Sequence, residues 1–190
     1  MQARIIGNHD TTRFVSEANG DAGLDPWTNP PSIPTDPAVY ARHRMALALI
    51  YTVGDLPVLY YGDEIGLAGG SDPDSRRVMP SMDTLSAEQT LVYQTVTRLG
   101  ELRTCSEALR AGARETLVAT RDTFAFTRAT ESGELAIVVF SKSSSTTSTP
   151  LPEGSFPAGD YVDAMTGEPV VLPLGASGGV SLEPLSFRVL

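Results

Sequence analysis

The pattern of hydrophobic and polar positions changes character partway along the chain. In the first part, short apolar runs predict two buried strands, one near Arg4–Gly7 and one that runs from Leu56 through Val58–Tyr61, and longer segments with helical spacing follow each of them. The helices are expected from residue 37 to just before Gly54, and over residues 86–103. Strands that alternate with helices in this way indicate parallel β/α units.

Local signals predict where these helices begin. Asp36 can cap the first helix, Pro37 suits its first position, and Gly54 can end it. Ser86 and Gln89 have the spacing of a capping box at the start of the second helix. The second helix is expected to bury one face, formed by Leu91, Val92, Thr95, Leu99 and Leu102.

After Gly112 the spacing becomes that of strands. Phe124 and Phe126 alternate with smaller residues, and apolar runs at 135–140 and 186–190 predict two further strands. Turn residues recur at short intervals between them. The chain is therefore expected to form two domains, an α/β domain over residues 1–112 and an all-β domain, an antiparallel β-sandwich, over residues 113–190.

Composition excludes several classes of function. The 190 residues carry 14 Lys and Arg against 23 Asp and Glu, a formal net charge of −9, so a nucleic-acid backbone is not an expected partner. The longest apolar run, Met45–Tyr51, is far shorter than the roughly 20 residues of a membrane span. The single cysteine, Cys105, excludes an internal disulfide and a multi-cysteine metal site. Nothing in the sequence requires a cofactor.

Polar residues follow the first predicted strand, in the order Gly7-Asn8-His9-Asp10. A strand that ends in this way also occurs in binuclear metallophosphoesterases, but such a site needs further histidine ligands, and the only other histidine is His43, inside a predicted helix. Taken alone, the four residues are either a functional cluster or simply a polar strand end.

Two further motifs favour the functional interpretation. Together with the first, they make the chain resemble the alpha-amylase family of retaining glycosidases (glycoside hydrolase family 13), over essentially its whole length. The matching segments, in the family's order, are Asn8-His9-Asp10-Thr11-Thr12-Arg13-Phe14, Pro57–Glu64 and Asp72-Pro73-Asp74-Ser75-Arg76-Arg77. One departure is Met79-Pro80-Ser81-Met82, which stands where the family often has an aromatic residue.

The resemblance implies a fold and a site. The fold is the last two β/α units of an incomplete (β/α)8 barrel, followed by the β domain, and the site lies at the carboxyl ends of the strands. In the family, the residue that matches Asp10 stabilises the transition state, and the one that matches His9 hydrogen-bonds the same sugar. Asn8, Asp72 and Arg76 are implied as substrate-binding residues. Asp72 and Arg76 at i, i+4 also suit a plain surface ion pair.

Trp27 is a further candidate for substrate binding. It lies in a long loop rich in Gly, Asn, Asp and Pro between the first predicted strand and the first helix. Loops of this length in compact domains are usually functional or mobile. Its indole ring could stack on a sugar face. Glu64, Tyr60 and Tyr61 are expected to be structural.

Two groups that the family's reaction needs are not found in this sequence. Retaining hydrolysis uses a nucleophilic carboxylate and an acid/base carboxyl group, which in the family lie on earlier barrel strands. The chain alone is therefore expected to be inactive, with an N-terminal barrel segment as its partner and a maltooligosaccharide or other alpha-glucan as substrate. The rival interpretation is a non-catalytic carbohydrate-binding or structural β module with a vestigial barrel fragment.

Overall fold

The structure, a computed structural model, describes residues 2–172 and 179–190. The chain forms two compact units: the first runs to Ile50 and resumes over Asp55–Arg98, and the second consists of Tyr51–Gly54 and Leu99–Leu190. The predicted domain range 113–190 includes residues 173–178, which lie outside the described part. No helix in the described part is both long and apolar enough to cross a membrane.

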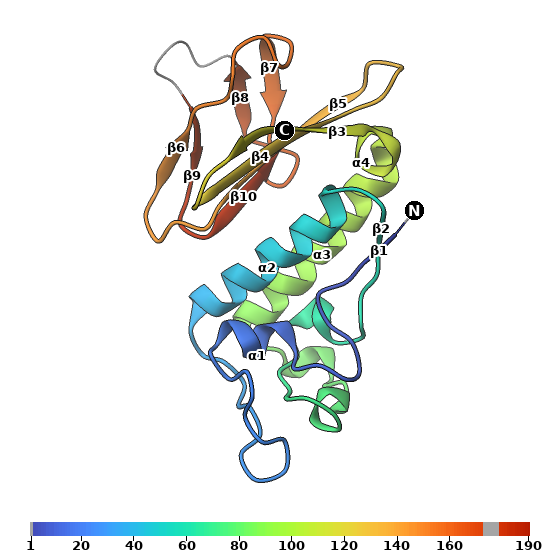
Figure 1. The fold of residues 1–190 in the computed structure, drawn as a ribbon, viewed down its shortest axis with the longest axis vertical. Coiled ribbons are helices and arrows are strands. Elements are labelled where there is room, and N and C mark those ends of the chain that lie inside the picture. The colour runs from blue at the N-terminus through green and yellow to red at the C-terminus, as the bar shows by residue number, and fades with distance from the viewer. Residues whose placement is uncertain (1, 173–178) are drawn as a thin grey trace. The chain divides into compact units, whose positions relative to one another are not determined.

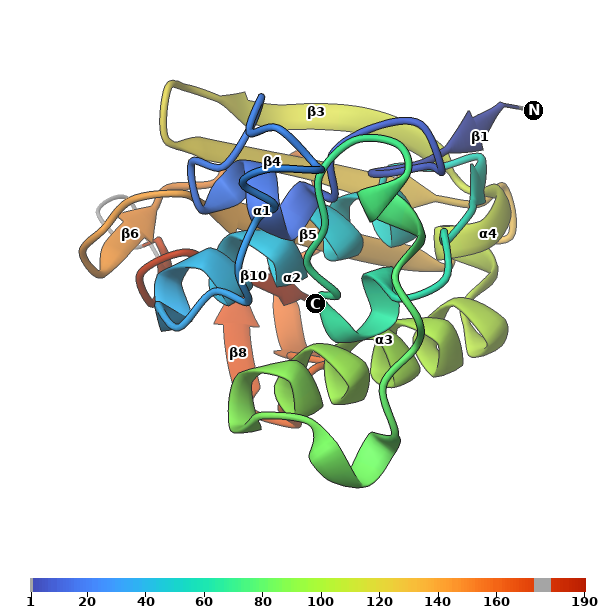
Figure 2. The same ribbon diagram turned by 90° about the horizontal axis from the view of Figure 1, so that it is seen from below.

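The first unit has the order of a β/α protein. Strand β1 pairs in parallel with β2, with Ala3 opposite Leu56 and Arg4 opposite Pro57, and helix α2 lies between the two strands in the sequence. Helices α2 and α3 lie side by side (Figures 1 and 2), and Arg44 Nη1 on α2 donates to Glu88 Oε2 on α3 at 3.3 Å. The elements are β1 (Ala3–Arg4), α1 (Phe14–Ala18), α2 (Pro37–Thr52), β2 (Leu56–Pro57) and α3 (Ala87–Cys105), with 3₁₀ turns at Asp63–Ile65, Asp74–Arg76 and Met82–Thr84.

The two strands differ from the prediction. Each is only two residues long, and the pairing lies at the start of each predicted segment, so that residues 58–61 are not a strand. The segment is not buried as expected either, because Leu56 is 51% exposed and Val58 is 38% exposed. The physical reason is that β1 and β2 pair only with each other in the described part of the chain. A sheet of two strands has neither the neighbours to extend its ladder nor a layer to cover its faces.

The helix boundaries agree with the prediction. Asp36 Oδ1 accepts the backbone N–H of Ala38 at 2.9 Å at the start of α2. At the start of α3, Ser86 N donates to Gln89 Oε1 at 3.1 Å and Gln89 N donates to Ser86 Oγ at 3.2 Å, which confirms the capping box. Val92, Thr95 and Leu99 of α3 are buried as expected, Leu102 is partly buried, and Leu91 is 41% exposed and so lies outside the buried stripe.

The second unit is built mainly of antiparallel strands (Figure 1). Four of them form one sheet in the order β10-β5-β4-β3, while β6 pairs with β9 and β7 pairs with β8. The elements are α4 (Glu107–Ala111), β3 (Ala113–Ala119), β4 (Thr123–Ala129), β5 (Leu135–Ser141), β6 (Thr147–Thr149), β7 (Gly159–Val162), β8 (Pro169–Leu172), β9 (Val180–Leu182) and β10 (Ser186–Val189).

Both faces of the four-stranded sheet carry apolar side chains. On one face, residues of β4 and β5 share a core with residues of β8 and β9, so the small sheets form a second layer, as in a sandwich. On the other face, Phe126 and Phe140 are 0% and 6% exposed, with ring centroids 6.4 Å apart. Of the two alternating phenylalanines, Phe126 is a core residue as predicted, and Phe124 is partly buried. The core members of the first face are Ala125, Ile137, Val139, Leu172, Val180, Leu182 and Leu190.

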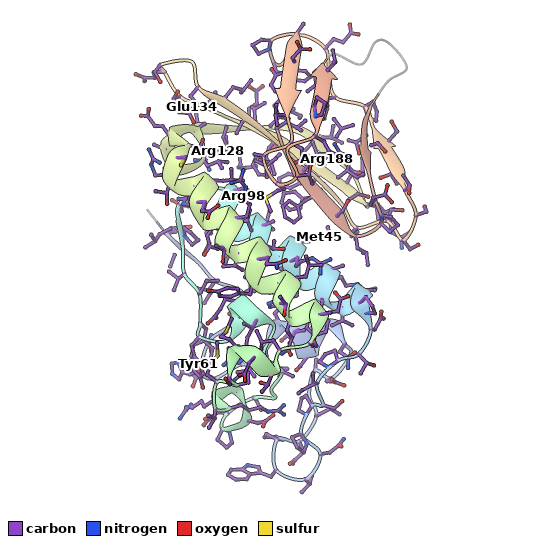
Figure 3. All side chains as sticks on the ribbon, turned by 180° about the vertical axis from the view of Figure 1, so that it is seen from behind. Met45, Tyr61, Arg98, Arg128, Glu134 and Arg188 are labelled. Carbon is purple, nitrogen blue, oxygen red and sulfur yellow. The ribbon has the colours of Figure 1, made fainter. Side chains whose placement is uncertain are left out.

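Polar contacts join the helical segments of this unit to its sheet, and Figure 3 labels two of the residues that make them, Arg128 and Glu134. Ser106 caps α4 by accepting the N–H of Leu109 at 3.2 Å, and its hydroxyl donates to Glu134 Oε1 at 2.6 Å. Arg128 Nη1 of β4 donates to the carbonyl of Thr52 at 3.2 Å. Gly54 has φ of +120°, and a Cβ there would lie 2.5 Å from Arg128 Nη1, so glycine is required at this position.

Candidate functional site

A tight turn follows β1 and displays His9 and Asp10. Asn8 Oδ1 accepts the backbone N–H of Asp10 at 2.8 Å and that of Thr11 at 3.2 Å. Asparagine side chains commonly form turns of this type. The side chains of His9 and Asp10 remain 61% and 66% exposed, 3.3 Å apart between His9 Nε2 and Asp10 Oδ1. In this structure, Asn8 thus acts through its carbonyl oxygen to shape the turn.

The loop before α3 brings Asp72 and Arg76 to the same place. Arg76 Nη2 lies 2.8 Å from Asp72 Oδ1 and 3.8 Å from Asp10 Oδ1, and Arg76 Nε donates to the carbonyl of His9 at 3.4 Å. We refer to His9, Asp10, Asp72 and Arg76 as the polar cluster. Four of the six predicted site residues therefore meet, although more than 60 positions separate the two pairs in the sequence.

The chemistry of the polar cluster suits a neutral ligand rich in hydroxyl groups. Its carboxylates accept hydrogen bonds and the Arg76 guanidinium donates them. The side chains of Asp10, Asp72 and Arg76 are about half exposed or more, so each ion pair adds at most about 1 kcal/mol to stability. The cluster is accessible, and its contribution to folding is small.

A buried arginine that sequence analysis left without a role lies close by. Arg13 is 1% exposed, and its Nε donates to the carbonyl of Ser75 at 3.0 Å while Nη1 donates to the carbonyl of Tyr61 at 2.6 Å. Nη1 also lies 3.2 Å from Asp63 Oδ1, and the guanidinium lies over the Tyr60 ring at 4.1 Å. Tyr60 thus has the packing role that was expected for it.

Two further buried titratable groups, Asp63 and His43, were assigned no role from the sequence. Burial raises the pKa of the Asp63 carboxyl to about 6, although the adjacent Arg13 opposes this shift. His43 Nε2 donates to the backbone carbonyl of Asp63 at 2.7 Å, and burial lowers the pKa of the imidazole to about 4. His43 is therefore neutral near pH 7 and acts as a core hydrogen-bond donor.

Trp27 stands apart from the polar cluster, on a neighbouring loop. It is 77% exposed, and its backbone N–H donates to Asp25 Oδ1 at 2.8 Å. This loop is joined to that of the cluster because Arg77 Nη2 donates to the carbonyl of Pro31 at 2.7 Å and to Asp74 Oδ2 at 2.6 Å. Tyr61, labelled in Figure 3, donates its hydroxyl to the carbonyl of Arg77 at 2.9 Å, a structural role like that of Tyr60.

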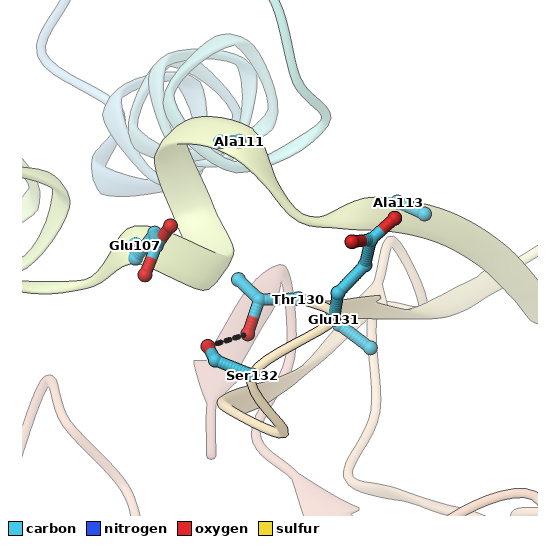
Figure 4. Close-up of a pocket in the computed structure, with 7 residues that line it drawn as sticks. Glu107, Ala111, Ala113, Thr130, Glu131 and Ser132 are labelled. Atoms are coloured by element: carbon cyan, nitrogen blue, oxygen red, sulfur yellow. Dashed lines mark hydrogen bonds between the residues drawn. The ribbon is translucent and has the colours of Figure 1, made fainter.

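A separate hollow lies in the second unit, between α4 and the turn that joins β4 to β5 (Figure 4). Glu107, Thr130, Glu131 and Ser132 line it together with three alanines, and Thr130 and Ser132 share a hydrogen bond of 2.8 Å. It contains none of the predicted site residues. Within residues 2–172 and 179–190, no group of His, Cys, Asp and Glu side chains has the form of a metal site.

The arrangement defines a class of protein. It is an α/β protein with antiparallel β-sheets after the α/β part, and its polar cluster follows the first of two parallel strands, on the side where α/β barrel enzymes carry their active sites.

Comparison with known proteins identifies the family. The chain is 34% identical over 140 residues to a cyclomaltodextrinase of Thermoanaerobacter pseudethanolicus, covering 74% of this chain and 21% of that protein. It is 28% identical over 182 residues to a cyclomaltodextrin glucanotransferase of Geobacillus stearothermophilus, covering 95% of this chain and 22% of that one. An Anoxybacillus alpha-amylase structure superposes with a TM-score of 0.78 at 25% identity, covering 98% of this chain and 37% of that one. The chain belongs to the alpha-amylase family, glycoside hydrolase family 13.

Two facts qualify the match. No family model matches the chain. The chain also spans only about a fifth of the length of these curated relatives, 21% of the first and 22% of the second.

Proposed function

We propose that the chain is the C-terminal portion of an alpha-amylase-type retaining glycosidase that acts on maltooligosaccharides or other alpha-glucans. In this proposal it supplies the end of the catalytic barrel, residues 1–112, and the β-sandwich domain, residues 113–190. The single observation that carries the proposal is the polar cluster, in which His9, Asp10, Asp72 and Arg76 meet at an exposed site close to the end of β1.

Each member of the cluster has a role that its chemistry allows. Asp10 binds sugar hydroxyl groups, and this bond strengthens as the oxocarbenium-like transition state develops, which lowers the barrier. Its charge also raises the pKa of a neighbouring acid, so that the acid stays protonated. His9 donates to the same sugar, while Asp72 and Arg76 bind a glucose further along the chain. Asn8 holds the turn, and Trp27 provides a stacking surface on the adjacent loop.

The nucleophile and the acid/base belong, in this proposal, to an N-terminal barrel segment outside the 190 residues. Three observations support such a partner. The chain spans about a fifth of its curated relatives. The parallel sheet of its first unit has two strands, and apolar side chains beside it, Ile5, Leu56 and Val58, are 49%, 51% and 38% exposed. Further barrel strands would cover these side chains and extend the sheet.

A binding experiment with the chain as it stands tests the site. We expect maltotriose to shift the backbone amide resonances of the polar cluster in nuclear magnetic resonance spectra and to release no product, because the nucleophile is missing. Asp72→Asn removes a charged acceptor at the site and weakens binding. Asp83→Asn is the matched control, since Asp83 is an aspartate of the same unit that bonds Ser81 outside the cluster. Equal loss in both variants, or no binding at all, contradicts the proposal.

A mass measurement tests the proposed partner. The intact mass of the native product, detected through a peptide from residues 113–190, is expected to be two to three times that of the 190 residues, since a barrel needs about 250 residues. A product of 190 residues that copurifies with no second polypeptide contradicts the proposed partner.

In the described part of residues 113–190, no observation favours the rival interpretation, a carbohydrate-binding or structural β module alone. A sugar-binding sheet needs exposed, flat aromatic side chains, whereas Phe126 and Phe140 are buried. The accessible polar groups with predicted roles lie in the first unit instead.

A further inference from the structure

Ser75 is a small buried residue that joins two parts of the polar cluster. It is 0% exposed and lies between Asp74 and Arg76 in a 3₁₀ turn. Its hydroxyl donates to the carbonyl of His9 at 2.6 Å, and its own carbonyl accepts Arg13 Nε at 3.0 Å. One residue therefore connects the turn that carries His9, the loop that carries Arg76, and the buried guanidinium beneath them.

Arg13 extends this framework to other segments of the first unit. Its Nη1 donates to the carbonyl of Tyr61, and its backbone N–H donates to the carbonyl of Gly69 at 3.0 Å. Gly69 N in turn donates to Ser16 Oγ at 3.0 Å. A buried guanidinium is costly unless its donors are satisfied. The carbonyls satisfy Arg13 Nε and Nη1, although Nη2 has no hydrogen-bond partner among the described residues, so the guanidinium favours the arrangement of segments that supplies these carbonyls.

The contacts within the polar cluster can be compared in strength with the contacts that Ser75 and Arg13 make. Within the polar cluster, Arg76 Nη2 to Asp10 Oδ1 is 3.8 Å and His9 Nε2 to Asp10 Oδ1 is 3.3 Å, and all three side chains are about half exposed or more. Such pairs are screened by solvent and contribute little. The Arg76 Nη2–Asp72 Oδ1 pair is closer, at 2.8 Å, but it lies within the loop and does not join the loop to the turn. The bonds from Ser75 Oγ and from the Arg13 side chain to backbone carbonyls are 2.6 to 3.0 Å long and buried or partly buried, and the loss of a partner costs more there than at an exposed site. These bonds are therefore better suited than the exposed ion pairs to join the turn to the loop.

We propose that Ser75 and Arg13 are positioning residues, which keep the Asp72–Arg76 loop against the Asn8–Asp10 turn so that Arg76 stands next to Asp10. The benefit to sugar binding rests on the proposed function. The positioning of Arg76 next to Asp10 rests on the geometry alone. If the two residues merely stabilise the fold, their loss lowers stability and leaves the cluster unchanged.

The test uses Ser75→Ala in the 190-residue chain, because it removes a single hydroxyl from a buried site. The matched control is Thr95→Val, which removes a buried hydroxyl from α3 in the same unit, where Thr95 Oγ1 donates to the carbonyl of Leu91. The side-chain resonances of His9 and Arg76 are followed without any sugar. The chain has two histidines, so a His9→Gln spectrum assigns the His9 ring directly.

We expect Ser75→Ala to shift both resonances and Thr95→Val to leave them unchanged, at equal signal from the core methyl groups. Resonances that stay at the wild-type position in Ser75→Ala overturn the positioning role. If Ser75→Ala does not fold, Ser75→Cys, with a similar side chain but a weaker donor, is tested in the same way.

A second measurement separates this inference from the proposed function. Maltotriose is titrated into the wild type and into Ser75→Ala, and we expect the dissociation constant to rise by up to roughly tenfold in the variant, the effect of one lost hydrogen bond. Shifted His9 and Arg76 resonances, together with a wild type that binds no maltotriose, would support the positioning role and overturn the proposed function. Equal affinity in both proteins would overturn the claimed benefit to binding.

Discussion

His43 should make the first unit less stable as the pH falls. Its imidazole is 1% exposed and donates to the carbonyl of Asp63, and burial lowers its pKa from 6.5 to about 4. Above pH 6.5 the ring is neutral in both the folded and the unfolded chain, so it makes no pH-dependent contribution. Between pH 6.5 and about 4 only the unfolded chain binds the proton, and stability is lost. At 1.36 kcal/mol for each pH unit, the full loss is about 3 kcal/mol.

The assay is urea unfolding from pH 7 to pH 4, followed by circular dichroism of the helices. We expect the free-energy difference between the wild type and His43→Gln to change by about 3 kcal/mol over this range, in the direction that favours the variant at low pH. His9→Gln is the matched control, because it removes the exposed histidine and keeps His43. Repeating the comparison in an Asp63→Asn background removes the titration of the neighbouring carboxyl.

One result would refute this reasoning. If the wild type and His43→Gln have parallel curves between pH 7 and pH 4, the imidazole is not held neutral by burial. The account of His43 as a core donor would then be wrong.

Four further predictions test other parts of the structure. In the longer enzyme that we propose, Asp10→Asn is expected to lower kcat by orders of magnitude at an unchanged melting temperature; near-normal turnover would remove Asp10 from the proposed reaction. Because burial raises the pKa of Asp63 from 3.8 to about 6, the wild type should lose stability relative to Asp63→Asn as the pH rises from about 4 to about 6, and urea unfolding should detect a fall of this sign. Ser106→Ala removes the hydroxyl that accepts the Leu109 N–H at the start of α4, and should lower the free energy of unfolding by about 1 kcal/mol in a thermal melt. An unchanged melting curve would contradict this prediction. A polypeptide of residues 113–190 should unfold in one cooperative transition by calorimetry, and a broad, heatless transition would show that these residues are not a domain of their own.

The parts of the fold that depend on neighbouring residues could be predicted from the sequence. Asp36 and the pair Ser86 and Gln89 define their helix starts through contacts two or three positions away, which the sequence displays directly. The strand expected over Val58–Tyr61 failed, because a ladder needs partners on other segments. The apolar composition of this segment indicated a buried strand. In the described part of the chain, however, β2 has β1 as its single partner strand.

The candidate site was likewise predictable only in part. His9, Asp10, Asp72 and Arg76 were selected by their resemblance to a family pattern, and the structure brings them together. Arg13 was part of that pattern, but neither the residue types of the pattern nor their spacing reveals that Arg13 is buried. Its hydrogen bonds go to carbonyls 48 and 62 positions away, and every residue has a carbonyl, so no residue type marks the partners.

That dependence on backbone acceptors affects how the protein can evolve. Arg13 binds the main-chain oxygens at positions 61 and 75, which remain when the side chains there are exchanged. Mutations at exposed positions of the Asp72–Arg76 loop can therefore accumulate without loosening its attachment. Such a loop is suited to directed evolution, because new side chains would be presented on an anchor that they do not disturb.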